Sequence, residues 1–489
     1  MHPRAGERVS FQPPDKNHLP MRLQTFLISA TLAALTGMGA AHSPAQSPPT
    51  RPNIVVLLAD DLGSSDVGWR GSPIKTPHLD ALANAGAKLD AFYVQPMCSP
   101  TRAALLTGRY PFRYGLQTSV VKPWSSYGLP VDERTLPQAL REVGYETAIV
   151  GKWHLGHARP EFLPLQRGFD HQYGHYNGAL DYFTHQRDGG HDWHRDDQPN
   201  YDKGYSTTLL AGEAVRLIES RDAAKPLFLY VPFTAVHAPH QVPEKYAEPY
   251  DSPRPRRKAY MGMVAAMDEA VGQIVAALRA QKIDGNTIIF FSSDNGGPNP
   301  GTISRNGDLR DGKGSTYEGG VRTCAFATWP GAIPAGSTRS PIHMVDLYPT
   351  LLAIAGGNAE QPKPIDGRNI LPLLKGEIAS AREEVLIHVG PQACAIRSGD
   401  WKLVLNGQRR LEEDAEDLNA PATQPTEPEL FDLATDISEK RNVAADHPEI
   451  VARLRARYDE LLKQAAPAES EARDSKFRSP KIWGHADQE

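Results

Sequence analysis

Cysteine is scarce in this chain, with three residues among 489. So few cysteines exclude the disulfide framework that stabilises small exported domains, and an odd number leaves at least one thiol outside any intramolecular pair. Cys324 and Cys394 could pair, although their spacing does not decide it. The third cysteine, Cys98, lies in a context that indicates chemistry.

The chain also has no large excess of charge of either sign. Its formal net charge is -5 and charged residues make up 23% of it, which is ordinary for a soluble globular protein. This balance gives no reason to expect a nucleic-acid partner. The length of 489 residues predicts two or three domains with an ample hydrophobic core.

The start of the chain has an apolar stretch, but only a short one. It covers residues 26–35, follows Arg22 and precedes small residues at 39–41. This order is typical of a secretory signal peptide, and the stretch is too short to cross a bilayer comfortably. A transmembrane anchor is the less favoured alternative.

We therefore expect residues 1–41 to hold an N-terminal extension and a signal peptide running from about Met21 to Ala41. Residues 42–52, with Ser, Pro and Gln, are expected to form a linker into the mature fold. The mature protein would be periplasmic or secreted, without stable membrane insertion.

Short apolar runs alternate with helical patterns through most of the chain. The runs suit parallel strands buried on both faces, and they cover residues 53–58, 147–150, 227–232 and 287–292. The helical patterns cover residues 79–85, 136–143 and 259–282. This alternation predicts an α/β domain with a large, mainly parallel sheet between helices, over residues 53–380.

The residue pattern changes near residue 380. The region 381–489 is expected to form a smaller C-terminal α+β subdomain with an antiparallel sheet. Its predicted strands are residues 384–388, 393–397 and 401–405, with Gly399-Asp400 as a hairpin turn. Residues 407–429 are expected to form a loop, and residues 448–464 a closing amphipathic helix.

Polar residues follow each of the four predicted parallel strands. Ligands of open α/β sheets bind beyond the carboxyl ends of the strands, so these side chains are expected at one edge. They are Asp60, Asp61, Lys152, His154, His237, Asp294 and Asn295.

The segment from Cys98 to Arg109 predicts a short helix. Ser99 can cap it, Pro100 suits its first turn and Gly108 suits its end. Cys98 would then lie at the helix N-terminus, where the dipole favours negative charge, with Arg102 one turn further on. A buried structural cysteine beside a capped helix is the alternative interpretation.

The acids at the strand ends suit a metal site. Asp60, Asp61 and Asp294 offer carboxylate oxygens and Asn295 an amide oxygen, a donor set that suits Ca²⁺ or Mg²⁺ better than zinc. Alone, Asp60-Asp61 would more often mark a turn or a helix cap. The second pair, at another strand end, favours the metal site.

The string from Cys98 to Arg109 resembles the signature of the formylglycine sulfatases. Other segments match that family in its order: Asp60-Asp61, residues 151–156, His237, residues 294–297 and residues 318–322. The similarity covers about residues 51–400. It implies an alkaline phosphatase-like fold and a sulfuric ester hydrolase whose Cys98 is oxidised to formylglycine by a formylglycine-generating or sulfatase-maturating enzyme.

The resemblance also implies a role for each site residue. A Ca²⁺ ion would be held by Asp60, Asp61, Asp294, Asn295 and the modified Cys98. The hydrated formylglycine would attack sulfur and give a sulfated-enzyme intermediate. Lys152 and Lys313 would bind the sulfate, Arg102 would orient the modified residue, His237 would bind substrate and protonate the leaving alcohol, and His154 would assist sulfate release.

Within this family, segments at residues 76–93, 114–120, 242–251 and 262–274 resemble the N-acetylgalactosamine-4-sulfatase (arylsulfatase B) branch. That branch implies a sulfated sugar, such as a glycosaminoglycan or marine-polysaccharide fragment, with 4-O-sulfated galactose or N-acetylgalactosamine favoured. The alternatives are a phosphonate monoester or phosphodiester hydrolase of the same superfamily, and a non-catalytic binder of sulfated glycans.

Other clusters have less specific interpretations. His185, His191 and His194 are expected on an active-site rim or a surface loop, rather than at a second metal. The basic run at residues 254–258 is expected to be a solvated charge cluster, with contact to a polyanionic substrate as the alternative.

Overall fold

The computed structural model describes residues 51–390, 393–407 and 427–485, all within one compact unit, Thr50–Glu489. The expected signal peptide, nearly all of the expected linker and most of the expected loop at 407–429 lie outside the described residues.

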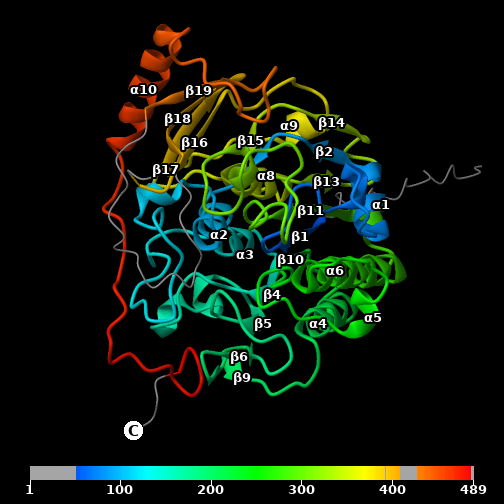
Figure 1. Cartoon of the computed structure of the whole chain (residues 1–489). Helices are drawn as coiled ribbons and strands as arrows, with labels where there is room; N and C mark the ends of the chain where they lie inside the picture. Colours follow the sequence, from blue (N-terminus) through cyan, green and yellow to red (C-terminus); the bar gives the residue numbers. More distant parts are fainter. Residues whose placement is uncertain (1–50, 391–392, 408–426, 486–489) are drawn as a thin grey trace, which may run out of the picture. The chain divides into compact units, whose positions relative to one another are not determined.

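A ten-stranded sheet organises the catalytic region (Figure 1). Its order is β14-β2-β13-β11-β1-β10-β4-β5-β8-β9, and the run from β11 to β5 is parallel. Antiparallel strands flank it on both sides, so the expected mainly parallel sheet is confirmed. The strands are β1 (Asn53–Ala59), β2 (Ala87–Leu89), β4 (Glu146–Lys152), β5 (His171–His175), β8 (His194–Arg195), β9 (Gln198–Pro199), β10 (Leu227–Pro232), β11 (Thr287–Ser293), β13 (Phe326–Thr328) and β14 (Gly336–Thr338).

The strand β1 shows why the apolar runs have no polar gaps. All of its residues are buried, with Val55 and Leu57 in one core cluster and Ile54 and Val56 in another. Alternate side chains point to opposite faces, so helices on both sides of the sheet bury one strand completely. One face is covered by α1 (Pro77–Ala85), α4 (Ser206–Ser220) and α6 (Pro255–Ala280), and the other by α2 (Cys98–Thr107), α3 (Leu136–Glu142) and α8 (Leu347–Ile354).

The helix α6 begins four residues before the expected start at residue 259. Met263 and Met267 are fully buried, as expected of core residues. The helix is long and apolar enough to span a membrane by composition, yet 72% of its most apolar window is buried inside the protein. The expectation of a solvated basic run is wrong for Arg257, which is buried and pairs with Asp66 at 2.6 Å.

The helix α2 begins at Cys98 and corrects the expected cap. Ser99 lies inside the first turn and does not cap the helix, because its hydroxyl donates to the His154 carbonyl at 2.8 Å. Gly108 ends the helix with a left-handed φ of 68°, as expected, and its N–H donates to the Ala104 carbonyl. A Cβ on Gly108 would lie 2.8 Å from Tyr348, so a larger residue would clash there.

The C-terminal region contains the expected antiparallel sheet. It consists of β16 (Glu384–His388), β17 (Ala393–Ser398), β18 (Trp401–Gly407) and β19 (Glu429–Asp432), and α10 (Pro448–Leu462) packs against it. Gly399 and Asp400 form the turn, and β19 was not anticipated. The fold class is confirmed, whereas the division between residues 380 and 381 stays a prediction.

Smaller elements complete the described chain. They are β3 (Phe92–Tyr93), β12 (Arg322–Thr323) and β15 (Ile342–His343) in a three-stranded sheet, the hairpin of β6 (Gln186–Arg187) and β7 (Gly190–His191), and the short helices α5 (Glu244–Ala247), α7 (Glu318–Val321) and α9 (Leu371–Leu374).

Candidate active site

The expected polar residues meet beyond the carboxyl ends of neighbouring strands. Asp60 and Asp61 follow β1, Asp294 and Asn295 follow β11, and Lys152 is the last residue of β4. The Asp60 N–H donates to the Ala235 carbonyl beyond β10, and the Asp294 N–H donates to the Ala59 carbonyl, both at 3.0 Å. These bonds hold the loops together where the sheet ends.

Arg102 lies at the centre of the charged cluster. Its side chain is fully buried and donates to Asp294 Oδ2 from both Nε, at 3.1 Å, and Nη2, at 2.8 Å. Nη2 also lies 3.2 Å from Asp60 Oδ2, and Nη1 donates to the Lys152 carbonyl at 3.0 Å. One guanidinium therefore fixes the positions of three strand ends, which a point-charge ammonium could not do.

Two lysines pair with the first two acids. Lys152 Nζ, fully buried, lies 2.5 Å from Asp60 Oδ2. Lys313 Nζ lies 2.9 Å from Asp61 Oδ1 and comes from the loop before α7. Buried charges are tolerated only when such partners compensate them.

Cys98 lies between two of the oxygen donors. Its Sγ is 3.5 Å from Asp60 Oδ1 and 3.4 Å from Asn295 Oδ1, and the residue is fully buried. The amide of Asn295 donates to Asp61 Oδ1 at 2.7 Å. This donation leaves Asn295 Oδ1 directed towards the sulfur as an acceptor.

The electrostatics of the cluster follow from burial and the unequal distribution of charge. Burial disfavours the charged form of Asp60, but Lys152, His237 and Arg102 outweigh it and lower the pKa of this carboxyl. Burial and the charge of Asp60 raise the pKa of Asp294. Burial, Asp294 and Asp60 together raise the pKa of the Cys98 thiol well above its ordinary value.

The loop carrying Lys313 approaches the strand ends closely. The Lys313 N–H donates to the Gly297 carbonyl at 3.3 Å, and the Gly296 N–H donates to the Gly320 carbonyl at 2.9 Å. A Cβ on Gly296 would lie 1.7 Å from the Gly319 carbonyl oxygen. Glycine is therefore required at position 296 for this packing.

His237 presents one ring nitrogen to the acids. Its Nδ1 lies 2.6 Å from the Ala238 carbonyl oxygen, so Nδ1 donates that bond. Nε2 lies 3.7 Å from Asp61 Oδ2, and the residue is 6% exposed. Nε2 is consequently the ring nitrogen that faces the acids of the cluster.

His154 is bound to a different part of the site wall. Its Nε2 lies 3.0 Å from the Val121 carbonyl oxygen, so this nitrogen donates. The Ser99 hydroxyl joins the same wall by accepting from the Val121 N–H at 3.0 Å. His154 is thereby fixed beside the residue that follows Cys98 in the chain.

Sequence reasoning missed residues that hold the catalytic loops. The hydroxyl of Tyr182 lies 2.7 Å from the Thr234 carbonyl oxygen and 2.9 Å from that of His237. Asn306 Oδ1 accepts from the Ser64 N–H at 3.2 Å and the Gly297 N–H at 3.1 Å. No motif marks these residues, because each acts through contacts between distant segments.

The expected position on an active-site rim or a surface loop is wrong for two of the histidines. His185 and His194 are buried, and their rings stack on Trp193 and Tyr176 at centroid distances of 4.5 and 4.2 Å. His191 is partly buried, with Nε2 2.8 Å from the Asn200 carbonyl oxygen. These aromatic contacts place the histidines in the packing of the β5–β9 region.

Within the described residues, one group of His, Cys, Asp and Glu side chains has the geometry for a metal ion. It consists of Asp60, Asp61, Cys98 and His237, whose ligand atoms lie within 4.8 Å of one another. The three cysteines are buried and none forms a disulfide, so Cys324 and Cys394 do not pair in this structure.

Comparisons with known proteins identify the family. Residues 52–357 match the family described as Sulfatase. Arylsulfatase J of Mus musculus is 40% identical over 362 residues, covering 72% of this chain and 60% of that protein. N-acetylgalactosamine-6-sulfatase of Canis lupus familiaris is 37% identical over 407 residues, covering 76% of each. Ps i-CgsB, solved in complex with k-i-k-neocarrahexaose, has a TM-score of 0.78 at 31% identity, covering 87% of this chain and 96% of that one.

The fold and the cluster of acids around a buried cysteine are those of a hydrolase of the alkaline phosphatase-like class. The chain belongs to the sulfatase family and is a sulfuric ester hydrolase. The expected family membership is confirmed. The closer resemblance to the N-acetylgalactosamine-4-sulfatase branch stays a prediction.

Proposed function

We propose that this protein hydrolyses sulfate esters on carbohydrates, with Cys98 converted to formylglycine as the nucleophile. The observation that carries the proposal is the position of Cys98, within 3.5 Å of Asp60 and Asn295 oxygens and at the first residue of α2. The formylglycine hydrate supplies a nucleophilic hydroxyl for attack on sulfur and a second hydroxyl through which the sulfated enzyme breaks down. A formylglycine-generating or sulfatase-maturating enzyme is the proposed maturation partner.

The donor set fits a calcium ion. Asp60, Asp61, Asp294 and Asn295 offer only oxygen, the donor that Ca²⁺ prefers, and modified Cys98 would add another. The tight grouping of the Asp60, Asp61 and Cys98 ligand atoms supports this assignment. A bound Ca²⁺ supplies positive charge to the sulfate oxygens and to the nucleophile.

The basic residues around the cluster have distinct proposed roles. Lys152 and Lys313 bind the sulfate oxygens and offset charge that develops during transfer. Arg102, through its bonds to Asp60, Asp294 and the Lys152 carbonyl, holds the groups that orient residue 98. Its proposed role is positioning, because its guanidinium is engaged with two carboxylates and a backbone carbonyl.

The two histidines are assigned to proton transfer. His237 binds the substrate near the ester oxygen and donates a proton from Nε2 to the departing alcohol, because its Nδ1 is engaged with the Ala238 carbonyl. His154 assists loss of the proton that accompanies sulfate release. Its fixed position beside Ser99 supports this assignment.

A sulfated sugar is the proposed substrate, with 4-O-sulfated galactose or N-acetylgalactosamine favoured. The relatives support the carbohydrate class, since one is named for N-acetylgalactosamine and another was solved with a neocarrahexaose. The N-terminal region supports a periplasmic or secreted location, where such polymers are met. The proposed roles of calcium and formylglycine do not depend on which sugar carries the sulfate ester.

The decisive experiment compares ester classes with matured protein. Sulfate release from 4-O- and 6-O-sulfated galactose and N-acetylgalactosamine should exceed hydrolysis of phosphonate monoesters and phosphodiesters in kcat/KM. Mass spectrometry of the peptide containing residue 98 should show formylglycine, and Cys98→Ala should be folded and inactive. Preferential phosphonate or phosphodiester hydrolysis would replace the proposal by its alternative, and active Cys98→Ala would exclude the nucleophile.

A further inference from the structure

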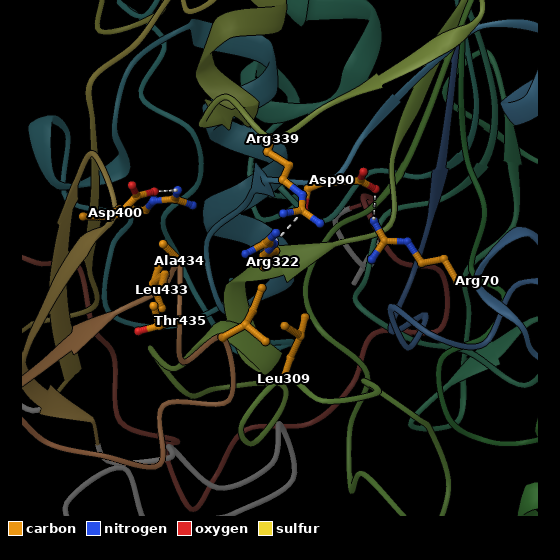
Figure 2. Close-up of a pocket in the computed structure, with 11 residues that line it drawn as sticks. Arg70, Asp90, Leu309, Arg322, Arg339, Asp400, Leu433, Ala434 and Thr435 are labelled. Atoms are coloured by element: carbon orange, nitrogen blue, oxygen red, sulfur yellow. Dashed lines mark hydrogen bonds and ion pairs between the residues drawn. The ribbon is translucent and has the colours of Figure 1, made fainter. Parts of the chain in front are cut away.

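A basic cavity lies apart from the catalytic residues (Figure 2). Its volume is about 660 Å³, within the range of small-molecule sites. It is lined by residues of the catalytic sheet region and by the turn and loop that follow β17 and β19. None of the lining residues belongs to the cluster around Cys98, and they include no cysteine, histidine or serine.

Arginine dominates the charge of this cavity. Arg70, Arg322, Arg339 and Arg397 line it, against two acids, Asp90 and Asp400. Figure 2 shows Arg70 and Arg339 directed towards Arg322 from two sides. The cavity wall therefore carries a surplus of two positive charges, given by four arginines and two aspartates.

The two buried arginines differ in how far carboxylates compensate their charge. Arg397 donates to neutral acceptors, the Gly399 carbonyl at 2.8 Å and the Tyr93 hydroxyl at 2.5 Å. Arg322 donates to the Asp90 carbonyl at 2.7 Å and to Glu318 at 3.1 Å, and Glu318 is shared with Lys402. Neutral acceptors therefore fix Arg397 without cancelling its charge, whereas Glu318 compensates part of the charge of Arg322.

The acids of the cavity compensate this charge weakly. Asp90 lies 3.6 Å from Arg70 and its side chain is 38% exposed, while Asp400 lies 4.0 Å from Arg397 with 67% exposed. Exposed ion pairs at such distances contribute little. Arg339 is exposed and has no ion-pair partner among the residues the structure describes. An anionic ligand would supply the missing partner.

Part of the lining is apolar. Leu309, Leu433, Ala434 and Ile437 contribute to it, and Figure 2 shows Leu433 and Ala434 beside Thr435 and Asp400, across the hollow from Arg322. A free tetrahedral oxyanion is too small to fill a cavity of about 660 Å³ and to contact its arginines and its apolar side chains together. A sulfated saccharide can do so, because the C–H face of a sugar ring packs on aliphatic side chains while its sulfate meets the guanidiniums.

We propose that this cavity is a second, non-catalytic binding site for a sulfated saccharide, which retains a sulfated chain on the enzyme. The choice of sulfate over other oxyanions rests on the proposed function, whereas the anionic and part-apolar character of the ligand rests on the cavity alone. The site gives the enzyme a preference for substrates longer than one sugar.

The test uses the double variant Arg70→Ala/Arg339→Ala, which leaves the two buried arginines in place. Its matched control, Arg279→Ala/Arg455→Ala, removes two positive charges from side chains that are 68% and 54% exposed elsewhere. Both are compared with the wild type on a sulfated galactan hexasaccharide and on nitrophenyl sulfate. The cavity variant should show a roughly tenfold higher KM for the hexasaccharide, equal to the loss of one good charged contact, with kcat and nitrophenyl sulfate turnover unchanged.

A binding experiment separates this proposal from the catalytic one. In a Cys98→Ala background, calorimetric titration with the hexasaccharide should show affinity lost in the cavity variant and kept in the control, while sodium sulfate and polyphosphate bind more weakly. Equal affinities in the two variants, or tighter binding of sodium sulfate or polyphosphate than of the hexasaccharide, would overturn the proposal. If the wild type hydrolyses no sulfate ester, the proposed function fails while this titration still decides the cavity.

Discussion

Replacing His237 by alanine tests the assignment of the general acid. His237 Nε2 lies 3.7 Å from Asp61, and its Nδ1 donates to the Ala238 carbonyl at 2.6 Å, so Nε2 is the nitrogen that faces the acids and is assigned to deliver the proton. General acid catalysis contributes about 10²–10⁴-fold. Sugar alcohols are poor leaving groups and need the proton, whereas nitrophenol leaves readily as its anion.

His237→Ala should therefore lose at least about 10²-fold more rate on a sulfated sugar than on nitrophenyl sulfate, or roughly 2.7 kcal/mol of selective transition-state stabilisation. Lys313→Ala is the matched comparison, since this lysine also contacts Asp61, at 2.9 Å, but acts on the shared sulfate. It should slow both substrates to a similar degree.

The assay must measure the sulfur-transfer step under pre-steady-state conditions, because slow breakdown of the sulfated enzyme would hide leaving-group effects. Calcium content should be measured in both variants, as both residues lie beside Asp61. Equal losses on the two substrates, at unchanged calcium content, would remove His237 from the acid role.

Three further perturbations test the site and its scaffold. Asp294→Ala should lose both bound calcium, measured by atomic emission, and turnover, and Ca²⁺ should restore chelated wild type better than Zn²⁺; normal calcium and rate would exclude the assignment. Tyr182→Phe removes the hydroxyl that contacts two buried carbonyls, so it should lower stability by about 1–3 kcal/mol. It should also slow hydrolysis of sugar sulfates more than that of nitrophenyl sulfate; an unchanged ratio of these two rates would make Tyr182 purely structural. Burial raises the pKa of Asp268 to about 6, so the folded state favours the protonated carboxyl. The free energy of unfolding should therefore fall by up to about 3 kcal/mol as pH rises from about 4 through 6. Urea unfolding should show this loss in the wild type and not in Asp268→Asn; the same pH dependence in both proteins would refute the assignment.

The sequence predicted the scaffold of the site because the relevant signals are local. The four apolar runs have no polar interruption, and each becomes a strand buried on both faces. Polar residues such as Asp60 and Asp294 directly follow those strands, so parallel topology alone brings them together. The position of Cys98 required only the helix pattern after it.

Other features depended on contacts that no local pattern records. Ser99 has the composition of a helix cap, but its hydroxyl bonds to the His154 carbonyl from a distant segment instead. His185 and His194 lie in a polar stretch, yet stacking on aromatic rings buries them. Local polarity therefore gave wrong predictions at positions where tertiary packing supplies the contact partner.

The charge balance of the cluster explains why a divalent cation suits it. Asp60, Asp61 and Asp294 face Arg102, Lys152 and Lys313, so the negative charges of the three carboxylates equal the positive charges of the three basic side chains. A neutral site has no net attraction for an anionic sulfate ester, and buried guanidinium and ammonium groups are already engaged with carboxylates. Oxygen donors arranged for Ca²⁺ give the site a means to gain positive charge without another buried lysine or arginine. The basic cavity differs from the active site, because its lining has four arginines against two aspartates and the buried Arg397 donates to neutral acceptors.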